Sequence, residues 1–148
     1  MRPTFAVTLL VALACALALG ACRGGGTARG GGDAAAHPEE VLAEVNSFTA
    51  ELMRKVETAR DPSAGLEEAQ QLLDARRDAL AARISALKRS PSLRADDEAR
   101  GRLLESEVEN VRNVSTLRTK YMSEAMRDGQ LRERIDRFVN SYASLWRE

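Results

Sequence analysis

The chain has 148 residues, and its 22 lysines and arginines balance 22 aspartates and glutamates. This length suits one ordinary domain, and the balanced charge excludes a long-range field that would attract nucleic acid. Both cysteines lie within the first 22 residues, so the remainder forms no internal disulfide and holds no thiol nucleophile. Aromatic residues make up only 4% of the chain, while alanine, leucine, arginine and glutamate are abundant. This composition favours an all-α domain.

The first 22 residues have the layout of an export signal. Arg2 supplies a short positive region, and an uncharged apolar run follows from Phe5 to Leu19. Leu19, Gly20, Ala21 and Cys22 then resemble the lipobox of bacterial lipoproteins, in which a leucine and two small residues precede a cysteine. The resemblance covers residues 1–22 only. It implies that the Cys22 thiol carries a diacylglyceryl group, that the signal peptide is cut before Cys22, and that the freed amine is acylated, for example with palmitate.

Two other interpretations of this segment stay open. Residues 4–21 just reach the roughly 18 apolar residues that can span a bilayer, which allows an uncleaved transmembrane anchor. A simple secretory signal cut after Ala21 would instead leave a free Cys22. Cys15 lies inside the apolar run, so we interpret it as a small hydrophobic residue.

A glycine-rich segment follows the signal. Residues 23–38 contain six glycines and no apolar period, which predicts a flexible tether with a root-mean-square span of about 20 Å. A phosphate-binding glycine loop is excluded because no strand precedes the glycines and no Gly-Lys-Ser/Thr ending follows them. We therefore expect a signal peptide over residues 1–21, a lipidated tether over 22–38 and a helical bundle domain over 39–148.

A helical period begins at Pro38. Proline suits the first turn of a helix, and Glu39 and Glu40 complement its positive end. Apolar residues then recur every three or four positions at Val41, Leu42, Val45, Phe48, Leu52, Met53 and Val56. Asp61 and Pro62 suit a helix cap and a first helical position, so they end this helix and begin the next. The tight turn predicts an antiparallel helical hairpin.

The second predicted helix carries a leucine heptad. Four leucines recur every seven residues, and one alanine and one isoleucine lie on the same side of the helix. These residues are Leu66, Ala69, Leu73, Leu80, Ile84 and Leu87. Such a seam fits either the core of a bundle or a parallel zipper dimer. We favour the bundle core because Arg76 and Arg83 occupy neighbouring seam positions and the pattern stops at Pro91.

Residues 90–92, Ser-Pro-Ser, interrupt the helical pattern, and two further helices are predicted after them. Acidic residues at 96–98 suit the first turn of the third helix. Its expected apolar stripe, in a helix that runs to about residue 127, consists of Leu104, Val108, Val111, Val114, Leu117, Tyr121 and Ala125. Asp128 and Gly129 end it, since glycine suits the left-handed conformation after a helix. The apolar face of the fourth helix comprises Leu131, Ile135, Phe138, Val139, Tyr142, Leu145 and Trp146.

Four amphipathic helices need a shared core, and short turns make consecutive helices antiparallel. The simplest architecture is an antiparallel up-down-up-down four-helix bundle, with a long three-helix bundle as the alternative. This plan is similar to that of the small haem-binding four-helix cytochromes of the periplasm, but in architecture only. The last helix here has no axial histidine and the domain has no cysteine, so we predict no haem.

The sequence offers few residues for common catalytic chemistry. His37 is the only histidine and ends the tether, which excludes Ser-His and Cys-His pairs. Glu105 and Glu109 share a helix face, as do Glu40 and Glu44, but di-metal bundles also need a Glu-x-x-His motif that is absent. We therefore predict no enzyme activity, no catalytic residue, no cofactor and no metal site.

Two groups of side chains suggest recognition. Arg76, Arg83 and Arg118 fall on or near apolar seams, where their methylenes would cover the core or their guanidinium groups would pair with glutamates. The alternative at Arg76 and Arg83 is a pocket for a carboxylate or phosphate. A stripe of aromatic residues on the last helix, at positions 138, 142 and 146, either closes the core or forms an exposed surface for a partner. We favour core closure.

These features predict a non-enzymatic lipoprotein of the bacterial envelope. A lipid anchor at Cys22 and a flexible arm would hold a bundle that binds another envelope protein or supports a complex, with no nucleic acid involved. The alternative is a small-ligand carrier or sensor that holds an apolar or anionic molecule in the bundle. Arg23 replaces the aspartate that follows the cysteine in inner-membrane lipoproteins of enterobacteria. This resemblance favours the outer membrane, with the domain facing the periplasm.

Overall fold

Helices make up all the regular structure of residues 37–147, the part of the chain that the computed structural model describes. This confirms the all-α prediction. The elements are α1 (Pro38–Thr58), α2 (Pro62–Arg89), α3 (Pro91–Ala95), α4 (Asp97–Lys120), α5 (Met122–Ala125), α6 (Gly129–Ala143) and a final 3-10 turn, η1 (Ser144–Trp146). They belong to one compact unit, Asp33–Glu148. The predicted signal peptide, Cys22 and most of the predicted tether lie outside the described residues.

The turn between α1 and α2 has the predicted construction. The Asp61 carboxylate accepts a hydrogen bond from the backbone amide of Ala64 at 3.2 Å, and Pro62 takes the first helical position. Gly65 then allows the two helices to touch, because a Cβ on this residue would lie 2.7 Å from the Cβ of Ala59. The turn therefore depends on a cap and on a close backbone approach.

The connection between α2 and α4 contains a helix that the sequence did not reveal. The Ser90 side chain caps α3 by accepting from the amide of Leu93 at 3.1 Å. The Asp96 side chain caps α4 by accepting from the amide of Ala99 at 2.9 Å. The sequence indicated a break at residues 90–92 and an acidic first turn at 96–98, but the five residues of α3 are too few to show a helical period.

The third predicted helix is shorter than expected. α4 ends at Lys120, Tyr121 leaves helical geometry with φ −105° and ψ 19°, and α5 follows as a separate turn. Asp128 then caps α6 by accepting from the amide of Leu131 at 3.2 Å. Gly129 is therefore the first residue of α6 and not the left-handed residue after a helix that we expected.

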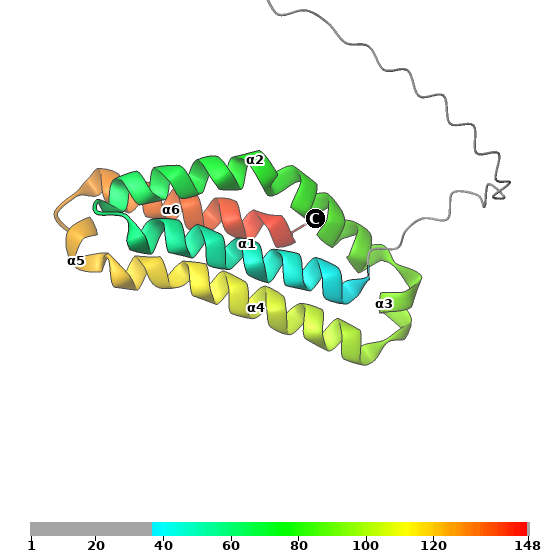
Figure 1. The fold of residues 1–148 in the computed structure, drawn as a ribbon. Helices are drawn as coiled ribbons and strands as arrows, with labels where there is room; N and C mark the ends of the chain where they lie inside the picture. The colour runs from blue at the N-terminus through cyan, green and yellow to red at the C-terminus, as the bar shows by residue number, and fades with distance from the viewer. Residues whose placement is uncertain (1–36, 148) are drawn as a thin grey trace, which may run out of the picture. The chain divides into compact units, whose positions relative to one another are not determined.

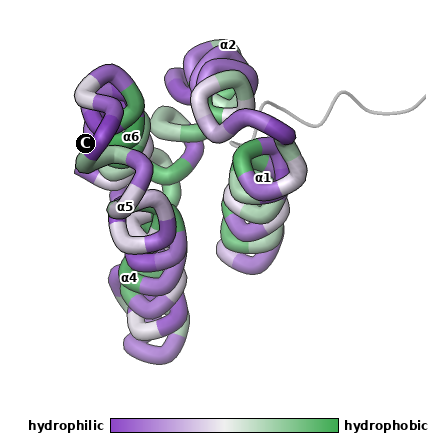
Figure 2. Tube along the Cα trace, turned by 90° about the vertical axis from the view of Figure 1, so that its left-hand side faces the viewer, coloured by the Kyte–Doolittle hydropathy of each residue, from purple (hydrophilic) through white to green (hydrophobic). Residues whose placement is uncertain are grey.

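The four long helices share one core. α1 packs against α2 and α4, and α6 packs against the same two helices. Figure 1 shows these helices side by side with α3 and α5 at opposite ends, and Figure 2 shows α1 with α2 on one side and α4 with α6 on the other. The apolar faces predicted for α1, α2 and the last helix are all buried, including the leucine heptad and the three aromatic residues. The helical bundle and the core closure are thus confirmed.

The stripe predicted for the third helix is wrong in its first half. Leu104 is 61% exposed and Val108 is 47% exposed. The positions of α4 that are buried are Ala99, Leu103, Ser106, Asn110, Val114 and Leu117. At about 100° per residue, Leu104 and Val108 lie on the side of the helix opposite Ser106 and Asn110. The middle of α4 therefore turns polar side chains inward and apolar side chains outward.

Hydrogen bonds to α1 explain why polar residues of α4 are buried. The Ser106 hydroxyl donates to the Asn46 side-chain oxygen at 3.0 Å, and the Asn110 side-chain amide donates to the same oxygen at 2.6 Å. A buried polar group costs little once it has a partner. Leu103, together with later residues of α4, supplies the apolar contacts that the expected stripe was to supply.

Candidate functional site

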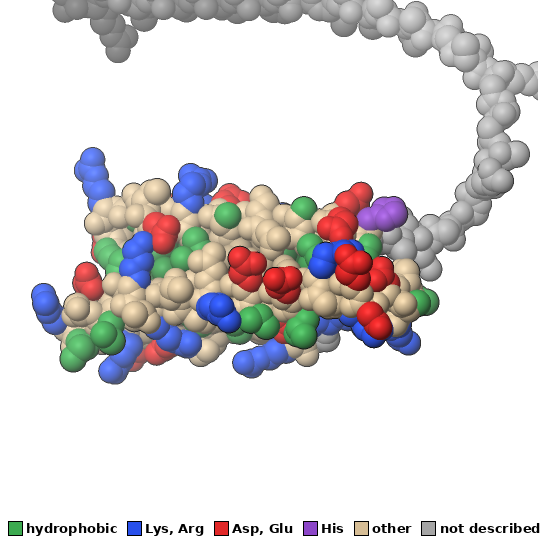
Figure 3. All heavy atoms as spheres, turned by 90° about the horizontal axis from the view of Figure 1, so that it is seen from below, with side chains coloured by type: hydrophobic (Ala, Val, Ile, Leu, Met, Phe, Trp, Pro, Cys, Tyr) green, Lys and Arg blue, Asp and Glu red, His purple; other side chains and the backbone are tan. Residues whose placement is uncertain are grey.

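The outer face of α4 is the main candidate for a functional surface. Six residues line a shallow hollow of about 560 Å³ there, and we call them the outer face: Gly101, Leu104, Glu105, Val108, Glu109 and Arg112. Their spacing of three, four, seven and eight residues places them on one side of the helix. Figure 3, viewed from below so that α4 lies toward the viewer, shows hydrophobic side chains among the charged ones on this surface.

The apolar part of the outer face is not needed by the bundle itself. Leu104 and Val108 are among the few large apolar residues exposed in the described chain. Gly101 sits within the same helix, and a Cβ added to it would meet nothing within 4 Å. Glycine inside a helix costs about 0.5–1 kcal/mol relative to alanine. The packing of the described residues therefore gives no reason for either the apolar pair or the glycine.

The charged part of the outer face also differs from its surroundings. Neighbouring charges of α4 are engaged: Glu107 pairs with Lys88 at 3.3 Å and Arg118 pairs with Asp136 at 2.7 Å. By contrast, Glu105, Glu109 and Arg112 form no ion pair or side-chain hydrogen bond within residues 37–147. The outer face thus combines an apolar centre with three charges that are available to a partner.

A second exposed apolar surface lies at the α5 end of the bundle. Met122 is 56% exposed and Met126 is 82% exposed. They border a hollow of about 230 Å³ that also contacts Arg132 and the buried Ile135. Methionine side chains are flexible and polarisable, so this surface can adapt to apolar groups of different shape.

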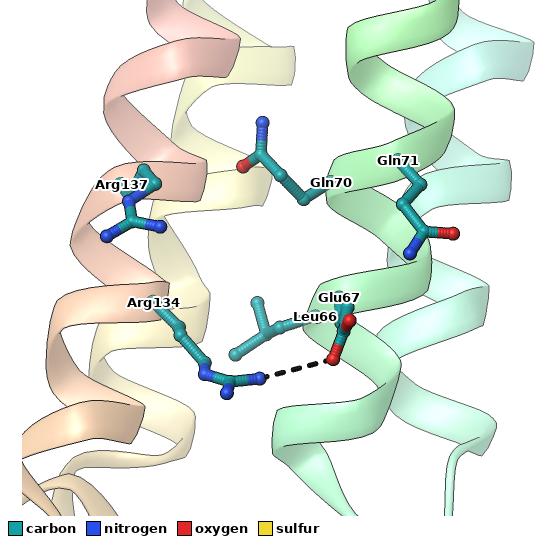
Figure 4. Close-up of a pocket in the computed structure, with 6 residues that line it drawn as sticks. All are labelled: Leu66, Glu67, Gln70, Gln71, Arg134 and Arg137. Carbon is teal, nitrogen blue, oxygen red and sulfur yellow. Dashed lines mark hydrogen bonds and ion pairs between the residues drawn. The ribbon is translucent and has the colours of Figure 1, made fainter.

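A polar groove runs between α2 and α6. It has a volume of about 330 Å³ and is lined by Leu66, Glu67, Gln70, Gln71, Arg134 and Arg137. Figure 4 shows Arg134 reaching from α6 toward Glu67 on α2, with a separation of 3.5 Å. Leu66, which belongs to the core, forms the apolar part of this groove. The groove can contact a small polar or anionic molecule, but it is a surface feature and not a cavity inside the core.

The structure brings Arg76 and Arg83 together around one carboxylate. Both guanidinium groups donate to Glu44 of α1, Arg76 at 3.2 Å. The Arg76 guanidinium also lies 4.9 Å from the centre of the Phe48 ring. Pairing with a glutamate on the facing helix was the expected arrangement. Glu44 occupies the place that a carboxylate or phosphate ligand would need in the alternative interpretation.

The aromatic residues of the last helix are part of the core. Trp146 is 3% exposed, and Phe138 and Tyr142 are fully buried. The Tyr142 hydroxyl forms a hydrogen bond with the Thr49 side chain of α1. Burial raises the pKa of Tyr142 to about 12, despite the hydrogen bond with Thr49, which lowers it. The phenol therefore stays protonated at neutral pH.

The remaining predictions concern chemistry and the membrane. His37 is exposed next to α1, and its side chain forms no cap hydrogen bond. Over residues 37–147 no group of three or more histidine, cysteine, aspartate or glutamate side chains is arranged to hold a metal ion. No helix in that range has the length and apolar character to cross a bilayer. The predicted lipidation residue, Cys22, lies outside the described part of the chain.

Sequence reasoning missed the outer face of α4 as a site, although a signal for it was present. The helix carries two apolar stripes, one through Leu104 and Val108 and one through Leu103, Val114 and Leu117. One stripe suffices for packing into a bundle, so the second was the signal that could have pointed to this face as a candidate site.

Comparison with known proteins assigns no family. No protein-family model matches the chain, and no curated protein or solved structure shows significant similarity to it. The functional conclusion therefore rests on the residues and the geometry described above.

Proposed function

We propose that the protein is a lipid-anchored module of the bacterial envelope that binds a protein partner without catalysis. In this proposal Cys22 carries the lipid, residues 23–38 form the tether, and the helical domain faces the periplasm from the outer membrane. The outer face of α4 is the binding surface. The observation that carries the proposal is the exposed apolar pair Leu104 and Val108 on a helix whose opposite side already contributes to the core.

The composition of the outer face supports protein binding. Isolated exposed leucines are ordinary, but an apolar pair on one helical face with a charged rim is typical of interaction surfaces. Glu105, Glu109 and Arg112 form such a rim around Leu104 and Val108. A partner helix that covered the apolar pair would also reach these charges. Helix-in-groove recognition uses this arrangement of apolar anchors and flanking charges.

We further propose that the four long helices alternate in direction as an up-down-up-down four-helix bundle. The neighbour relations support this, since α1 and α6 each pack against both α2 and α4. The tight turn at Asp61 and the short connection through α5 also favour opposite directions for the helices that they join.

Lipid labelling and photo-crosslinking in the native host test the proposed function. Metabolic labelling with an alkyne analogue of palmitate should mark the wild-type chain and should not mark Cys22→Ser. A photo-crosslinking amino acid at Leu104 should then capture a protein, whereas the same amino acid at Ala86, an exposed position of α2, should not. Lack of label on the wild-type chain would contradict the anchor. Equal capture from both positions would contradict the outer face as the binding surface.

A small-ligand carrier is the second candidate, and the groove between α2 and α6 is the observation that favours it. Arg137 lines this groove and forms no ion pair in the described range, while Leu66 supplies an apolar contact. Anilinonaphthalene sulfonate, an apolar dye with a negative charge, is a suitable probe. The carrier hypothesis expects weaker binding of the dye to Arg137→Ala than to the wild-type protein, and equal binding would contradict it.

A further inference from the structure

The outer face of α4 has the spacing of a coiled-coil seam. Small or apolar residues alternate by three and four positions at Gly101, Leu104, Val108, Val111 and Ser115. Alternation by three and four is the pattern with which two helices pack against each other along their length. Gly101, Leu104 and Val108 are exposed, and Val111 and Ser115 are half-buried. The seam is therefore exposed from Gly101 to Val108 and partly exposed beyond it, where Val111 also packs against the core.

The seam is complementary to itself when two copies run in opposite directions. A two-fold axis beside Val108 places this residue against Val108 of the second copy. The same axis places Leu104 beside Val111 of the second copy, and Gly101 beside Ser115. The large residues thus meet at the centre and the small residues meet at the edges, where the absent Cβ of Gly101 permits a close approach.

The charges next to the seam follow the same symmetry. Glu105 and Arg112 are seven residues apart, each directly after a seam position. In an antiparallel pair with its axis beside Val108, Glu105 lies level with Arg112 of the second copy and on the same side. The symmetry generates two such ion pairs. Neither side chain pairs with another residue of its own chain over residues 37–147, so both remain available for this contact.

We propose that the partner of the outer face is a second copy of this chain, bound through an antiparallel pairing of the two α4 helices. The inference deepens the proposed function and rests on its binding surface. Charge complementarity favours this occupant, because the antiparallel register centred on Val108 brings together Glu105 and Arg112, whereas Arg100 and Glu107, which flank the other side of the seam, already pair with Asp97 and Lys88 of their own chain. The apolar contact is small, so the dimer is weak in dilute solution. Confinement of the anchored chain to a membrane raises its effective concentration and populates the dimer.

Disulfide trapping of the full chain in membranes of the native host tests the proposal. Val108→Cys places a thiol next to the two-fold axis, and mild oxidation should link two copies into a covalent dimer. Asn113→Cys is the matched control, since this residue is exposed on the same helix but lies outside the seam. The wild-type chain controls for its two native cysteines. The expected result is several-fold more dimer from Val108→Cys than from either control.

A charge exchange then tests the antiparallel register. In the Val108→Cys background, Glu105→Arg or Arg112→Glu alone places like charges opposite each other, and each should lower dimer formation roughly tenfold because two symmetric pairs are affected. The double exchange Glu105→Arg with Arg112→Glu restores opposite charges and should restore the dimer. Both residues are exposed and unpaired, so thermal unfolding should change little in all three variants.

Three outcomes would overturn the inference. They are equal dimer yields from Val108→Cys and Asn113→Cys, trapping of a different protein in place of a second copy, and failure of the double exchange to restore the dimer. Trapping of a different protein would leave the proposed function standing. A dimer formed by a chain without acyl groups would contradict the anchor and leave the pairing of the α4 helices standing.

Discussion

α2 and α4 carry similar sequence patterns and use them in opposite ways. The leucines of α2 recur every seven residues, as in a zipper that joins two chains, yet Leu66, Leu73, Leu80 and Leu87 are buried within this chain. The seam of α4 through Leu104 and Val108 was expected to face the core, yet it is exposed. A heptad pattern therefore shows that a helix has a packing face, but it does not show whether the partner belongs to the same chain.

The inward sides of the two helices explain the difference. α2 presents only apolar or small residues to the core, so no other face could replace its leucine seam. α4 has a second inward option, in which Leu103, Val114 and Leu117 supply apolar contacts and Ser106 and Asn110 bond to Asn46. In this orientation of α4 the buried polar side chains have hydrogen-bond partners, and Leu104 and Val108 face the solvent.

The largest expected effect is on stability, and it separates the two seams directly. Leu73→Ala should lower the free energy of unfolding by about 2–5 kcal/mol, because Leu73 is fully buried and the change creates a cavity. Leu104→Ala should change it by less than about 0.5 kcal/mol, because this side chain is largely exposed. Urea unfolding followed by circular dichroism measures both. Similar losses in the two variants would contradict the assignment of the α4 seam to the surface.

The second prediction concerns alkaline pH and tests the apolar core independently of either seam. The pKa of Tyr142 is raised from 10.0 to about 12 by burial. A raised pKa means that the folded state favours the protonated phenol, so this contribution is fully present below pH 10 and is lost between pH 10 and pH 12. Two pKa units correspond to about 2–3 kcal/mol.

Unfolding measured from pH 9 to pH 12 in the wild-type protein and in Tyr142→Phe checks this pH dependence. The wild-type protein should lose more stability than the variant over this range, since phenylalanine has no proton to lose. Equal slopes in the two proteins would show that Tyr142 does not carry the effect.

The third prediction concerns the polar inward side of α4. Asn110→Ala should lower the free energy of unfolding by about 1–3 kcal/mol, because it removes the side-chain amide that donates to Asn46 in a buried setting. Asn113→Ala is the matched control at an exposed position of the same helix. Chemical unfolding of the two variants gives the comparison. If the control lost as much stability as Asn110→Ala, the hydrogen bonds to α1 would not determine the orientation of α4.

The smallest effect is expected where α2 meets α1 at the surface. Arg83→Ala removes one of the two arginines that donate to Glu44, and Arg83 is about two-fifths exposed. Exposed ion pairs contribute little, so the loss should stay below about 1 kcal/mol. Differential scanning fluorimetry with and without inorganic phosphate, at a concentration roughly 1,000-fold above a micromolar dissociation constant, checks this variant. If phosphate raised the melting temperature of the wild-type protein but not that of Arg83→Ala, the result would support an anion-binding pocket at Arg76 and Arg83.

Much of the fold could be predicted because its signals are local. The faces of α1, α2 and α6 follow from apolar periods, and the cap at Asp61 follows from a residue type that bonds to free backbone amides. The register of α4 could not be predicted, because two apolar stripes compete on one helix and the choice depends on Asn46, some 60 residues earlier in the chain. The candidate site was missed for the same reason.

The proposed lipid anchor on Cys22 can be checked by measuring the intact mass of the protein. The protein is extracted from membranes of the native host and compared with the Cys22→Ser variant. With the anchor in place, the wild-type mass corresponds to a chain beginning at residue 22 plus acyl chains, and the variant shows no such species. An unmodified amino terminus or an uncleaved wild-type chain would contradict the anchor.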